Sequence, residues 1–273
     1  LGFKISKIIL EGPEDSLKLT QNTQPSILLV SFSIFTVLKN EFNFNMEKVN
    51  FFAGHSLGEY SALLCAESIS FQDSLVLLYE RGKFMQEAVP LGKGGMLAIL
   101  GSEVEEINKY ILEVKSKGVC EIANDNAQGQ IIVSGNLEPI DELKSILKKN
   151  KKKCIPLSVS APFHCSLMNS AAIKMKEKIN AVNFKKPNFE IVSNVTALPV
   201  DNPKDIKELL VKQIYSKVKW RESILFMGEN KVNEFIEFGP GKVLTGLMKR
   251  ILPNSNSFSI NSIDDIKNLK NES

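Results

Sequence analysis

The chain has 273 residues, of which 43% are hydrophobic and 24% charged, a composition typical of a folded globular protein with one sizeable core. Basic residues exceed acidic ones by only three, so the charge gives no reason to expect a nucleic acid as partner. Arginine is scarce, with only Arg81, Arg221 and Arg250, and the two histidines are His55 and His164. Chemistry that needs an imidazole therefore has two candidates.

Targeting and membrane patterns are absent from the sequence. Its longest apolar tract, residues 26–38, has about 13 residues and is interrupted by Ser and Thr, whereas a membrane span needs about 20. We interpret it as a buried helix and expect no membrane association. The sequence starts at Leu1 without an initiator Met and shows no signal-peptide pattern, so we expect a processed chain or a fragment. The four cysteines have no C-x-x-C spacing, and we interpret them as structural thiols of a cytoplasmic protein: Cys65, Cys120, Cys154 and Cys165.

The first ninety residues are predicted to be mainly helical. The apolar spacing predicts, in chain order, a helix, a buried strand and two helices over residues 24–39, 48–53, 57–66 and 71–88. Pro90 ends the last of these helices, and three glycines between residues 92 and 95 mark a crossover.

Residues 91–161 show a different order of elements, β-α-β-β-α-β. The predicted elements are strand 96–100, helix 104–117, strands 119–124 and 130–134, helix 139–150 and strand 153–159. This is the order of the ferredoxin-like unit. We therefore expect a small ferredoxin-like domain inserted into a larger domain made of residues 1–90 and 162–273.

After Pro162 the chain returns to alternating helices and strands. We predict helix 166–182, strand 189–193, helices 203–212 and 220–229, strand 234–238 and helix 241–251. Such alternation favours a mainly parallel sheet, so the expected fold class is α/β with an α/β-hydrolase-like core. The polar tail after Pro253 is interpreted as frayed.

The strongest local motif is Gly-His-Ser-Leu-Gly at residues 54–58, a Gly-x-Ser-x-Gly sequence between a predicted strand and a predicted helix. In that context a sharp turn exposes the Ser56 hydroxyl, and the helix N-terminus directs main-chain N–H groups at an oxyanion. We predict that Ser56 is a nucleophile and that the main-chain N–H of Leu57 is an oxyanion donor.

A serine nucleophile needs a base. His55 is adjacent to Ser56, and neighbouring side chains diverge on a tight turn, so His164 is the better candidate. It lies in Ser-Ala-Pro-Phe-His-Cys-Ser, which we expect to be a loop. An ordinary α/β-hydrolase places its histidine near the end of the domain. Here at least two strand-and-helix units follow His164, which counts against a simple hydrolase.

Arg81 is a third candidate, because it lies on the predicted helix that follows the nucleophile helix. Lysine supplies nearly all other positive charges of this chain. An arginine at this position therefore suggests bidentate binding of a carboxylate, which lysine cannot provide because it lacks the planar guanidinium. Considered alone, the residue is equally compatible with an ion pair to Glu80 or Glu87.

These residues occur in segments that closely resemble the malonyl-CoA:acyl carrier protein transacylases of bacterial fatty acid synthesis. The likeness covers nearly the whole chain, in family order, through residues 23–26, 54–63, 81–88, 124–126, 161–164, 213–220 and 238–246. The most specific segments are Gly-His-Ser-Leu-Gly-Glu-Tyr-Ser-Ala-Leu from Gly54 and Phe-Gly-Pro-Gly-Lys-Val-Leu-Thr-Gly from Phe238.

The resemblance implies a role for each candidate. Ser56 would carry the malonyl group as an ester, and His164 would be the base for acylation and the acid that releases the CoA thiol. The main-chain carbonyl of Gln213 would orient His164 in place of a carboxylate. Arg81 would bind the free carboxylate of malonyl, and losing that pairing costs on the order of 3–5 kcal/mol, enough to separate malonyl from acetyl.

Two more residues are expected near the substrate by the same resemblance. Phe163 matches a bulky residue of malonyl-selective relatives that leaves little room for a methyl branch, although it could equally pack the loop. One excluded methyl group is worth about 1–3 kcal/mol. Asn126 is expected to line the pocket. No metal or redox cofactor is needed for acyl transfer.

One departure from the family pattern stands out. Family members open with a short strand and a Gly-Gln-Gly loop whose glutamine supplies a second oxyanion contact, and this sequence has no equivalent. Losing one such donor typically costs about 10²–10³ in rate. We therefore expect the sequence to be an incomplete copy of a working enzyme.

The leading hypothesis is a cytoplasmic, monomeric acyltransferase whose partners are malonyl-CoA and acyl carrier protein, with neither nucleic acid nor membrane involved. Two alternatives remain open from the sequence. A serine esterase or thioesterase would pass the acyl group to water, and a catalytically impaired fragment would only bind the carrier protein.

Overall fold

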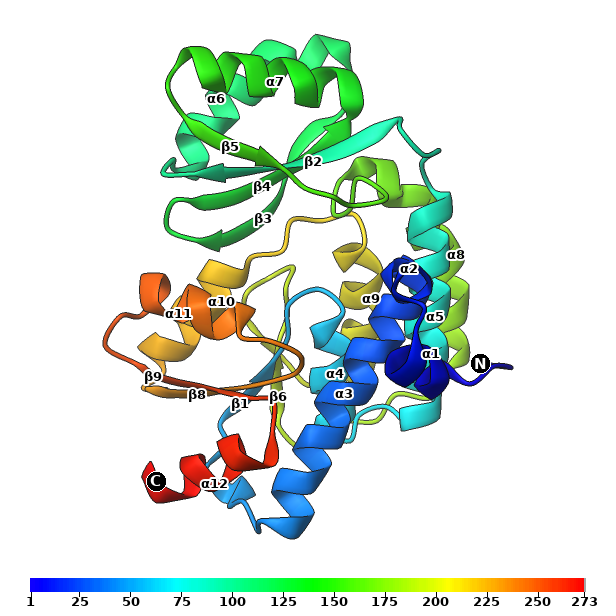
Figure 1. Ribbon diagram of the computed structural model, residues 1–273, viewed down its shortest axis with the longest axis vertical. Helices are drawn as coiled ribbons and strands as arrows, with labels where there is room; N and C mark the ends of the chain where they lie inside the picture. The colour runs from blue at the N-terminus through cyan, green and yellow to red at the C-terminus, as the bar shows by residue number, and fades with distance from the viewer. Residues whose placement is uncertain (273) are drawn as a thin grey trace.

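The computed structural model describes residues 1–272 and has an α/β fold with mixed sheets. The helices of the larger part are α1 (Ile5–Glu11), α2 (Glu14–Lys18), α3 (Thr20–Glu41), α4 (Gly58–Cys65), α5 (Phe71–Glu87), α8 (Asn169–Ala181), α9 (Pro203–Gln213), α10 (Trp220–Glu229), α11 (Val243–Ile251) and α12 (Ile263–Glu272), with 3-10 turns at Met46–Lys48 and Ser166–Met168. Its strands are β1 (Phe51–Ala53), β6 (Glu190–Val192), β7 (Pro199–Val200), β8 (Glu234–Phe238) and β9 (Asn256–Ile260). Figure 1 shows this part below a smaller one.

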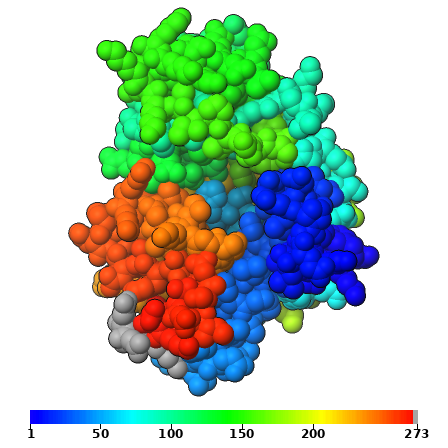
Figure 2. Space-filling model, viewed as in Figure 1, coloured from blue at the N-terminus to red at the C-terminus, as the bar shows by residue number. Residues whose placement is uncertain are grey.

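The smaller part is one antiparallel sheet covered by two helices. Its elements are β2 (Gly94–Leu100), α6 (Val104–Val114), β3 (Cys120–Ala127), β4 (Gln130–Asn136), α7 (Leu137–Lys149) and β5 (Lys153–Pro156), with a 3-10 turn at Lys115–Lys117. The strands pair in the order β3-β4-β2-β5, and α6 and α7 lie on the same face of the sheet (Figure 1). Buried apolar side chains from the sheet and both helices form a separate core, including Leu97, Ile107 and Leu143. Figure 2 shows this part occupying one end of the surface.

The parallel strands of the larger part fall into two sheets rather than the single sheet expected. β1 pairs with β6 in parallel and β7 joins β6 antiparallel, while β8 and β9 form a separate parallel pair. A cavity of about 940 Å³ is lined by both sheets, through Phe51 and Phe52 of β1 and Phe235 and Ile236 of β8. Within residues 1–272 the two sheets therefore contribute facing walls of one cavity without pairing.

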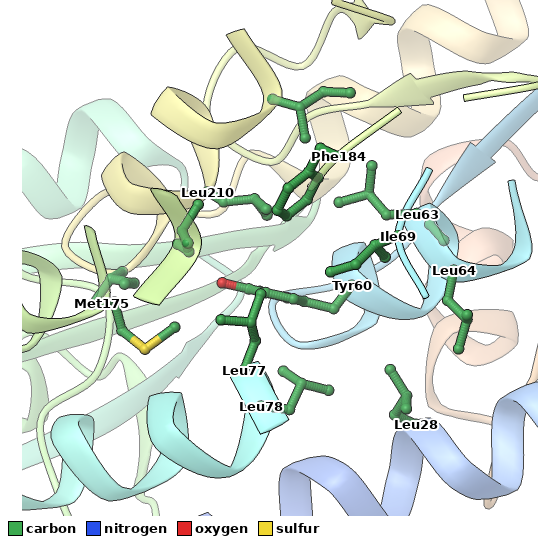
Figure 3. Packing of buried hydrophobic residues seen from close by; sticks show 14 of the residues in the cluster. Leu28, Tyr60, Leu63, Leu64, Ile69, Leu77, Leu78, Met175, Phe184 and Leu210 are labelled. Atoms are coloured by element: carbon green, nitrogen blue, oxygen red, sulfur yellow. The ribbon is translucent and has the colours of Figure 1, made fainter. Parts of the chain in front are cut away.

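The main core lies under α4, the helix that follows the nucleophile turn. Tyr60, Leu63 and Leu64 of α4 point into a cluster that Leu77 and Leu78 of α5 complete (Figure 3). The Tyr60 ring is fully buried, and among the described residues its hydroxyl has no hydrogen-bond partner. Burial raises the pKa of Tyr60 to about 12. This packing fixes α4, and with it the position of the turn that begins the helix.

Helices α3 and α5 pack unusually closely at Gly82. A Cβ at this position would lie 2.5 Å from the main-chain oxygen of Thr20 and 2.6 Å from Cα of Gln21. Only glycine leaves space for this approach. The contact places the first turns of α3 beside the part of α5 that carries Arg81.

The prediction that the tail after Pro253 is frayed is wrong. Residues 256–260 form β9, which pairs in parallel with β8, and α12 follows it. Ile260, Ile266 and Leu269 are buried in a cluster with Leu38 of α3. Ser262 caps the helix, because its hydroxyl oxygen accepts from the main-chain N–H of Asp265, and the Asp265 carboxylate accepts from the main-chain N–H of Ser262 in return. The polar residues of the tail lie between apolar ones that reach the core.

Most other predicted elements are confirmed to within a few residues, and α10 and β8 have the predicted bounds. Helices α1 and α2 were not predicted from the sequence. The predicted start of α3, at residue 24, was too late, because the first turn of this helix, from Thr20, consists of polar residues that show no apolar spacing. No helix within the described part of the chain has the length and apolar character needed to cross a membrane.

Candidate active site

The nucleophile turn connects β1 to α4. Ser56 has a φ of 54°, a left-handed conformation that costs a non-glycine residue about 1–3 kcal/mol. Its main-chain N–H donates to Asn194 Oδ1 at 2.7 Å, and its carbonyl oxygen accepts from Gln213 Nε2 at 2.9 Å. Gly54 is required here, because a Cβ would collide with the main-chain carbonyl of Gly58. The turn therefore has the geometry of the predicted elbow, and its strained serine is held on both sides.

Ser56 and His164 lie within hydrogen-bond distance, with 2.7 Å between Oγ and Nε2. His164 follows β5 in a loop and also has a left-handed backbone, with a φ of 58°. Its Nδ1 lies 2.9 Å from the main-chain oxygen of Gln213. Since a carbonyl can only accept, Nδ1 carries the hydrogen and Nε2 has a free lone pair. That lone pair faces the hydroxyl of Ser56, which is the arrangement of a nucleophile and its base.

His164 is held in its neutral form. The imidazole is 5% exposed. Its burial, and to a smaller extent the positive charge of Arg81, lowers the pKa of His164 to about 3. The hydrogen bond to the Gln213 carbonyl acts in the opposite direction but is outweighed. His164 is therefore an unprotonated acceptor at neutral pH, as a base for Ser56 must be.

Arg81 is a buried cation beside the nucleophile. Its side chain is 1% exposed, with Nη2 3.1 Å from Ser56 Oγ. Two glutamine side-chain oxygens hold the guanidinium: Gln24 Oε1 accepts from Nη1 and Gln213 Oε1 from Nη2, both at 2.8 Å. Within residues 1–272 no carboxylate is paired with Arg81, and its Nε–H has no partner. Burial lowers the pKa of the guanidinium, and the nearby acidic groups of Tyr60 and Glu59 only partly oppose this effect.

The alternative interpretation of Arg81 as a surface ion pair is thereby removed. Glu80 and Glu87 instead face Lys178 and Lys174 of α8. Another arginine, Arg221, does form a conventional pair, donating from Nη2 to Asp125 at 2.8 Å. Arg81 is different because it is buried without such a pair. A buried guanidinium without an ion-pair partner, next to a nucleophile, can bind an incoming carboxylate.

His55 points away from the dyad. Its Nε2 lies 2.8 Å from Asn126 Oδ1, and its ring packs against Trp220 with 5.6 Å between centroids. Burial lowers the pKa of His55, so the ring is a neutral donor to Asn126. Asn126 of β3 thus lies beside the nucleophile turn. Its contact with His55 is the structural link between the smaller part of the fold and the elbow.

Phe163 and Leu57 flank the two catalytic candidates. Phe163 is half-buried and packs against both the main core and the cluster around Met96. Leu57 directly precedes α4, so its main-chain N–H lies at the N-terminal end of that helix, next to Ser56. Leu57 and Gly58 also line the cavity of about 940 Å³. Ser56, Arg81 and His164 are not among the residues that line this cavity.

Three site residues were not identified as such from the sequence: Gln24, Glu59 and Asn194. Gln24 and Glu59 fall inside segments that resemble the family, but no pattern in the residues assigned them a contact. Glu59 is 2% exposed, and burial raises the pKa of its carboxyl to about 7. Asn194 follows β6 and had no sequence signal. All three are held to the site by hydrogen bonds between segments distant in the chain.

Comparison with known proteins gives consistent similarities. The acyl transferase domain family matches residues 1–268. The malonyl CoA-acyl carrier protein transacylase of Bacillus subtilis is 42% identical over 92% of this chain and 78% of that protein, and the Escherichia coli K12 protein of the same name is 38% identical over 96% and 84%. The crystal structure of acyl-carrier-protein S-malonyltransferase from Bartonella henselae superposes with a TM-score of 0.95 at 39% identity, covering 98% of this chain and 86% of that one. A malonyl transacylase solved with its type II PKS acyl-carrier protein gives 0.95 at 36% identity, over 100% and 87%.

Proposed function

Because the chain belongs to the acyl transferase domain family, we propose that Ser56, His164 and Arg81 are the residues with which it moves malonyl groups. The protein is an acyltransferase that passes the malonyl group from malonyl-CoA to acyl carrier protein, in fatty acid synthesis. The observation that carries the residue assignment is the buried guanidinium of Arg81, 3.1 Å from Ser56 Oγ and paired with no carboxylate in residues 1–272.

In the first half-reaction Ser56 Oγ attacks the thioester carbonyl of malonyl-CoA while its proton passes to His164 Nε2. The single hydroxyl hydrogen is directed to His164, because Oγ accepts from Arg81 on its other side. The main-chain N–H of Leu57 stabilises the oxyanion. The carbon–sulfur bond then breaks, and the CoA sulfur takes the proton from His164.

The second half-reaction reverses these roles. The phosphopantetheine thiol of the carrier protein gives its proton to His164 and attacks the malonyl ester. The ester bond to Ser56 breaks, and Oγ recovers its proton from His164. Throughout, the main-chain carbonyl of Gln213 orients the imidazole and stabilises its protonated form, the role that a carboxylate has in other serine enzymes.

Substrate selection is assigned to Arg81, Phe163 and Asn126. Arg81 binds the free carboxylate of malonyl, which an acetyl group lacks. Phe163 borders the loop of His164, where a bulky ring disfavours a branched acyl chain. Asn126 is assigned to the site because its contact with His55 places it beside the nucleophile turn.

For the architecture, we assign residues 91–161 to a ferredoxin-like inserted domain and residues 1–90 and 162–273 to an α/β-hydrolase-like core. The β-α-β-β-α-β order of the smaller part, its antiparallel sheet order and its separate core support the first assignment. The strand-turn-helix elbow at Ser56 supports the second. A monomer located in the cytoplasm remains our expectation.

The test is intact-mass analysis after incubation with malonyl-CoA, comparing wild type with Ser56→Ala. We expect one malonyl adduct on the wild type that acyl carrier protein removes, and none on the variant. An adduct on both proteins, or on neither, contradicts the role of Ser56. Loss of the adduct to water at the same rate with and without carrier protein favours the hydrolase alternative.

A further inference from the structure

Behind the dyad, one buried carboxyl group contacts both residues whose side chains hold the main chain of Ser56. Glu59 Oε2 accepts from Gln213 Nε2 at 2.7 Å and from the main-chain N–H of Asn194 at 3.2 Å. Gln213 in turn binds the carbonyl of Ser56, and Asn194 Oδ1 binds its N–H. The strained peptide groups on both sides of the nucleophile are thus anchored by residues that share Glu59 as their partner.

The side chain of Gln213 has its orientation fixed from both ends. Both hydrogens of its amide are used, one on Glu59 and one on the Ser56 carbonyl, which leaves Oε1 for Arg81 Nη2. Turning the amide over would direct its NH₂ group at a guanidinium that can only donate and its oxygen at an acceptor carboxylate. Glu59 and the Ser56 carbonyl together therefore determine that an acceptor faces Arg81.

Building on the proposed function, we propose that Glu59 is a positioning residue of the transfer reaction, acting through Gln213 to fix both Ser56 and the Arg81 guanidinium. It does not touch the reacting atoms. The same glutamine supplies the main-chain acceptor for His164 at 2.9 Å, so nucleophile, base and carboxylate site all contact one residue that Glu59 holds in place. The consequence is that Glu59 affects both the reactivity of Ser56 and the preference for a malonyl group.

The test compares Glu59→Gln with Glu59→Leu. A glutamine can keep an acceptor oxygen at the position of Oε2, so we expect Ser56 to be malonylated within about threefold of the wild-type rate. Leucine removes the acceptor, and misplacing a catalytic group by about 1 Å costs about 10²-fold in rate. The ratio of malonyl-CoA to acetyl-CoA acylation should also fall about 10-fold or more in Glu59→Leu, because one hydrogen bond to Arg81 is disturbed.

Glu237→Leu is the matched control. Like Glu59, Glu237 is a glutamate that accepts several hydrogen bonds. Its donors are two main-chain N–H groups and one hydroxyl at the start of α11. We expect it to lower the melting temperature without changing the malonyl-to-acetyl ratio. If Glu59→Leu does not fold, Gln213→Leu replaces it, because this variant keeps the main-chain acceptor of His164 and should lose the same discrimination.

A neutral reagent separates this inference from the substrate assignment. Phenylmethylsulfonyl fluoride forms a bond from its sulfur to Ser56 Oγ and releases fluoride, without needing any acyl substrate. We expect Glu59→Leu to be labelled about 10-fold more slowly than wild type and Glu59→Gln at nearly the wild-type rate. If wild type is labelled by this reagent but takes no malonyl group, the substrate proposal fails while the role of Glu59 is still decided. The positioning role of Glu59 is overturned by any of three results. The reagent labels Glu59→Leu at the wild-type rate, the ratio of malonyl to acetyl transfer is unchanged in Gln213→Leu, or Glu59→Gln and Glu59→Leu lose equal activity.

Discussion

Ser56 and His164 meet at 2.7 Å, and both have left-handed backbones, with φ values of 54° and 58°. Two strained residues that point at each other indicate a site in which the surrounding contacts override local preference. For Ser56 those contacts are the amides of Asn194 and Gln213. For His164 it is the Gln213 carbonyl. Gln213 therefore stabilises both partners.

Arg81→Ala should impair malonyl transfer selectively. The carboxylate of malonyl would enter a buried site without its cation, which costs about 3–5 kcal/mol and lowers malonyl-CoA acylation by about 10²–10³-fold. Acylation by acetyl-CoA should fall much less, because it loses only the hydrogen bond from Arg81 to Ser56 Oγ. Stopped reactions analysed by intact mass give both rates. Arg81→Lys tests the planar fork, and we expect it to recover only part of the loss. Equal losses for both substrates would show that Arg81 is not a carboxylate site.

The residues of the dyad could be predicted from the sequence, and their supports could not. Ser56 is marked by a local motif. His164 could be identified as its base because the sequence has only one other histidine, and that one is adjacent to Ser56. Nothing marks Asn194 or Gln24, because side-chain amides are common and their contacts join segments far apart in the chain. Without the family resemblance Gln213 would also have been missed, since any residue can supply a main-chain carbonyl.

The fold shows the same division between local and long-range information. Apart from β7, the helices and strands from α4 to α11 followed the apolar periodicity. The partition of the strands into separate sheets instead depends on pairing between distant segments. The C-terminal tail was misjudged because Ser and Asn alternate with its apolar residues. Phe258 and Ile260 alternate as a half-buried strand requires, and Ser262 and Asp265 have the spacing of a helix cap.

The pH dependence of acylation should reflect the unusual His164. Burial and the charge of Arg81 hold its pKa near 3 in the free enzyme, so kcat/KM for malonyl-CoA should stay flat below pH 6.5, down to about pH 5. An unperturbed histidine would instead give a tenfold loss per pH unit below 6.5. Rates of Ser56 acylation between pH 5 and 8 decide between the two. The carboxyl of Glu59, with a pKa of about 7, titrates in the same window, so the profile is also measured in Glu59→Gln, and a limb near 6.5 that persists in this variant would contradict the buried, neutral imidazole.

The same shift affects stability, with a definite sign. Between pH 6.5 and about 3 the unfolded chain protonates His164 and the folded chain does not, so this group lowers the free energy of unfolding as the pH falls through that window. Urea unfolding of wild type and His164→Gln at pH 7 and pH 5 isolates the effect. The variant should lose less stability on acidification than wild type does. An identical change of unfolding free energy with pH in the two proteins would show that His164 does not contribute to the pH dependence of stability.

Phe163→Ala should relax the selection against branched acyl groups. Removing the ring opens space beside the His164 loop, and one accommodated methyl group is worth about 1–3 kcal/mol, or roughly 10-fold or more in methylmalonyl-CoA acylation relative to malonyl-CoA. Competition between the two thioesters, read by mass, measures the ratio. If the ratio is unchanged while the melting temperature drops, Phe163 serves packing alone, as its contacts with both cores would also permit.

The C-terminal helix should contribute to global stability. Ile266 and Leu269 are 2% and 5% exposed, and each truncation to Ala should cost about 2–5 kcal/mol of unfolding free energy. Lys267→Ala, an exposed position of the same helix, is the control and should change it by less than about 0.5 kcal/mol. Urea titration measures all three. Changes near zero for Ile266 and Leu269 would restore the interpretation of a frayed tail.

The close approach of α3 and α5 at Gly82 has a consequence for how the substrate preference of this enzyme can evolve. Gln24 reaches Arg81 from α3, so the guanidinium is aimed by the spacing between two helices as well as by its own rotamer. A mutation in that packing seam, touching neither substrate nor dyad, can thus turn the guanidinium away from the acyl chain. Selection for enzymes with altered acyl preference should therefore recover changes in the helix seam alongside changes in the pocket wall.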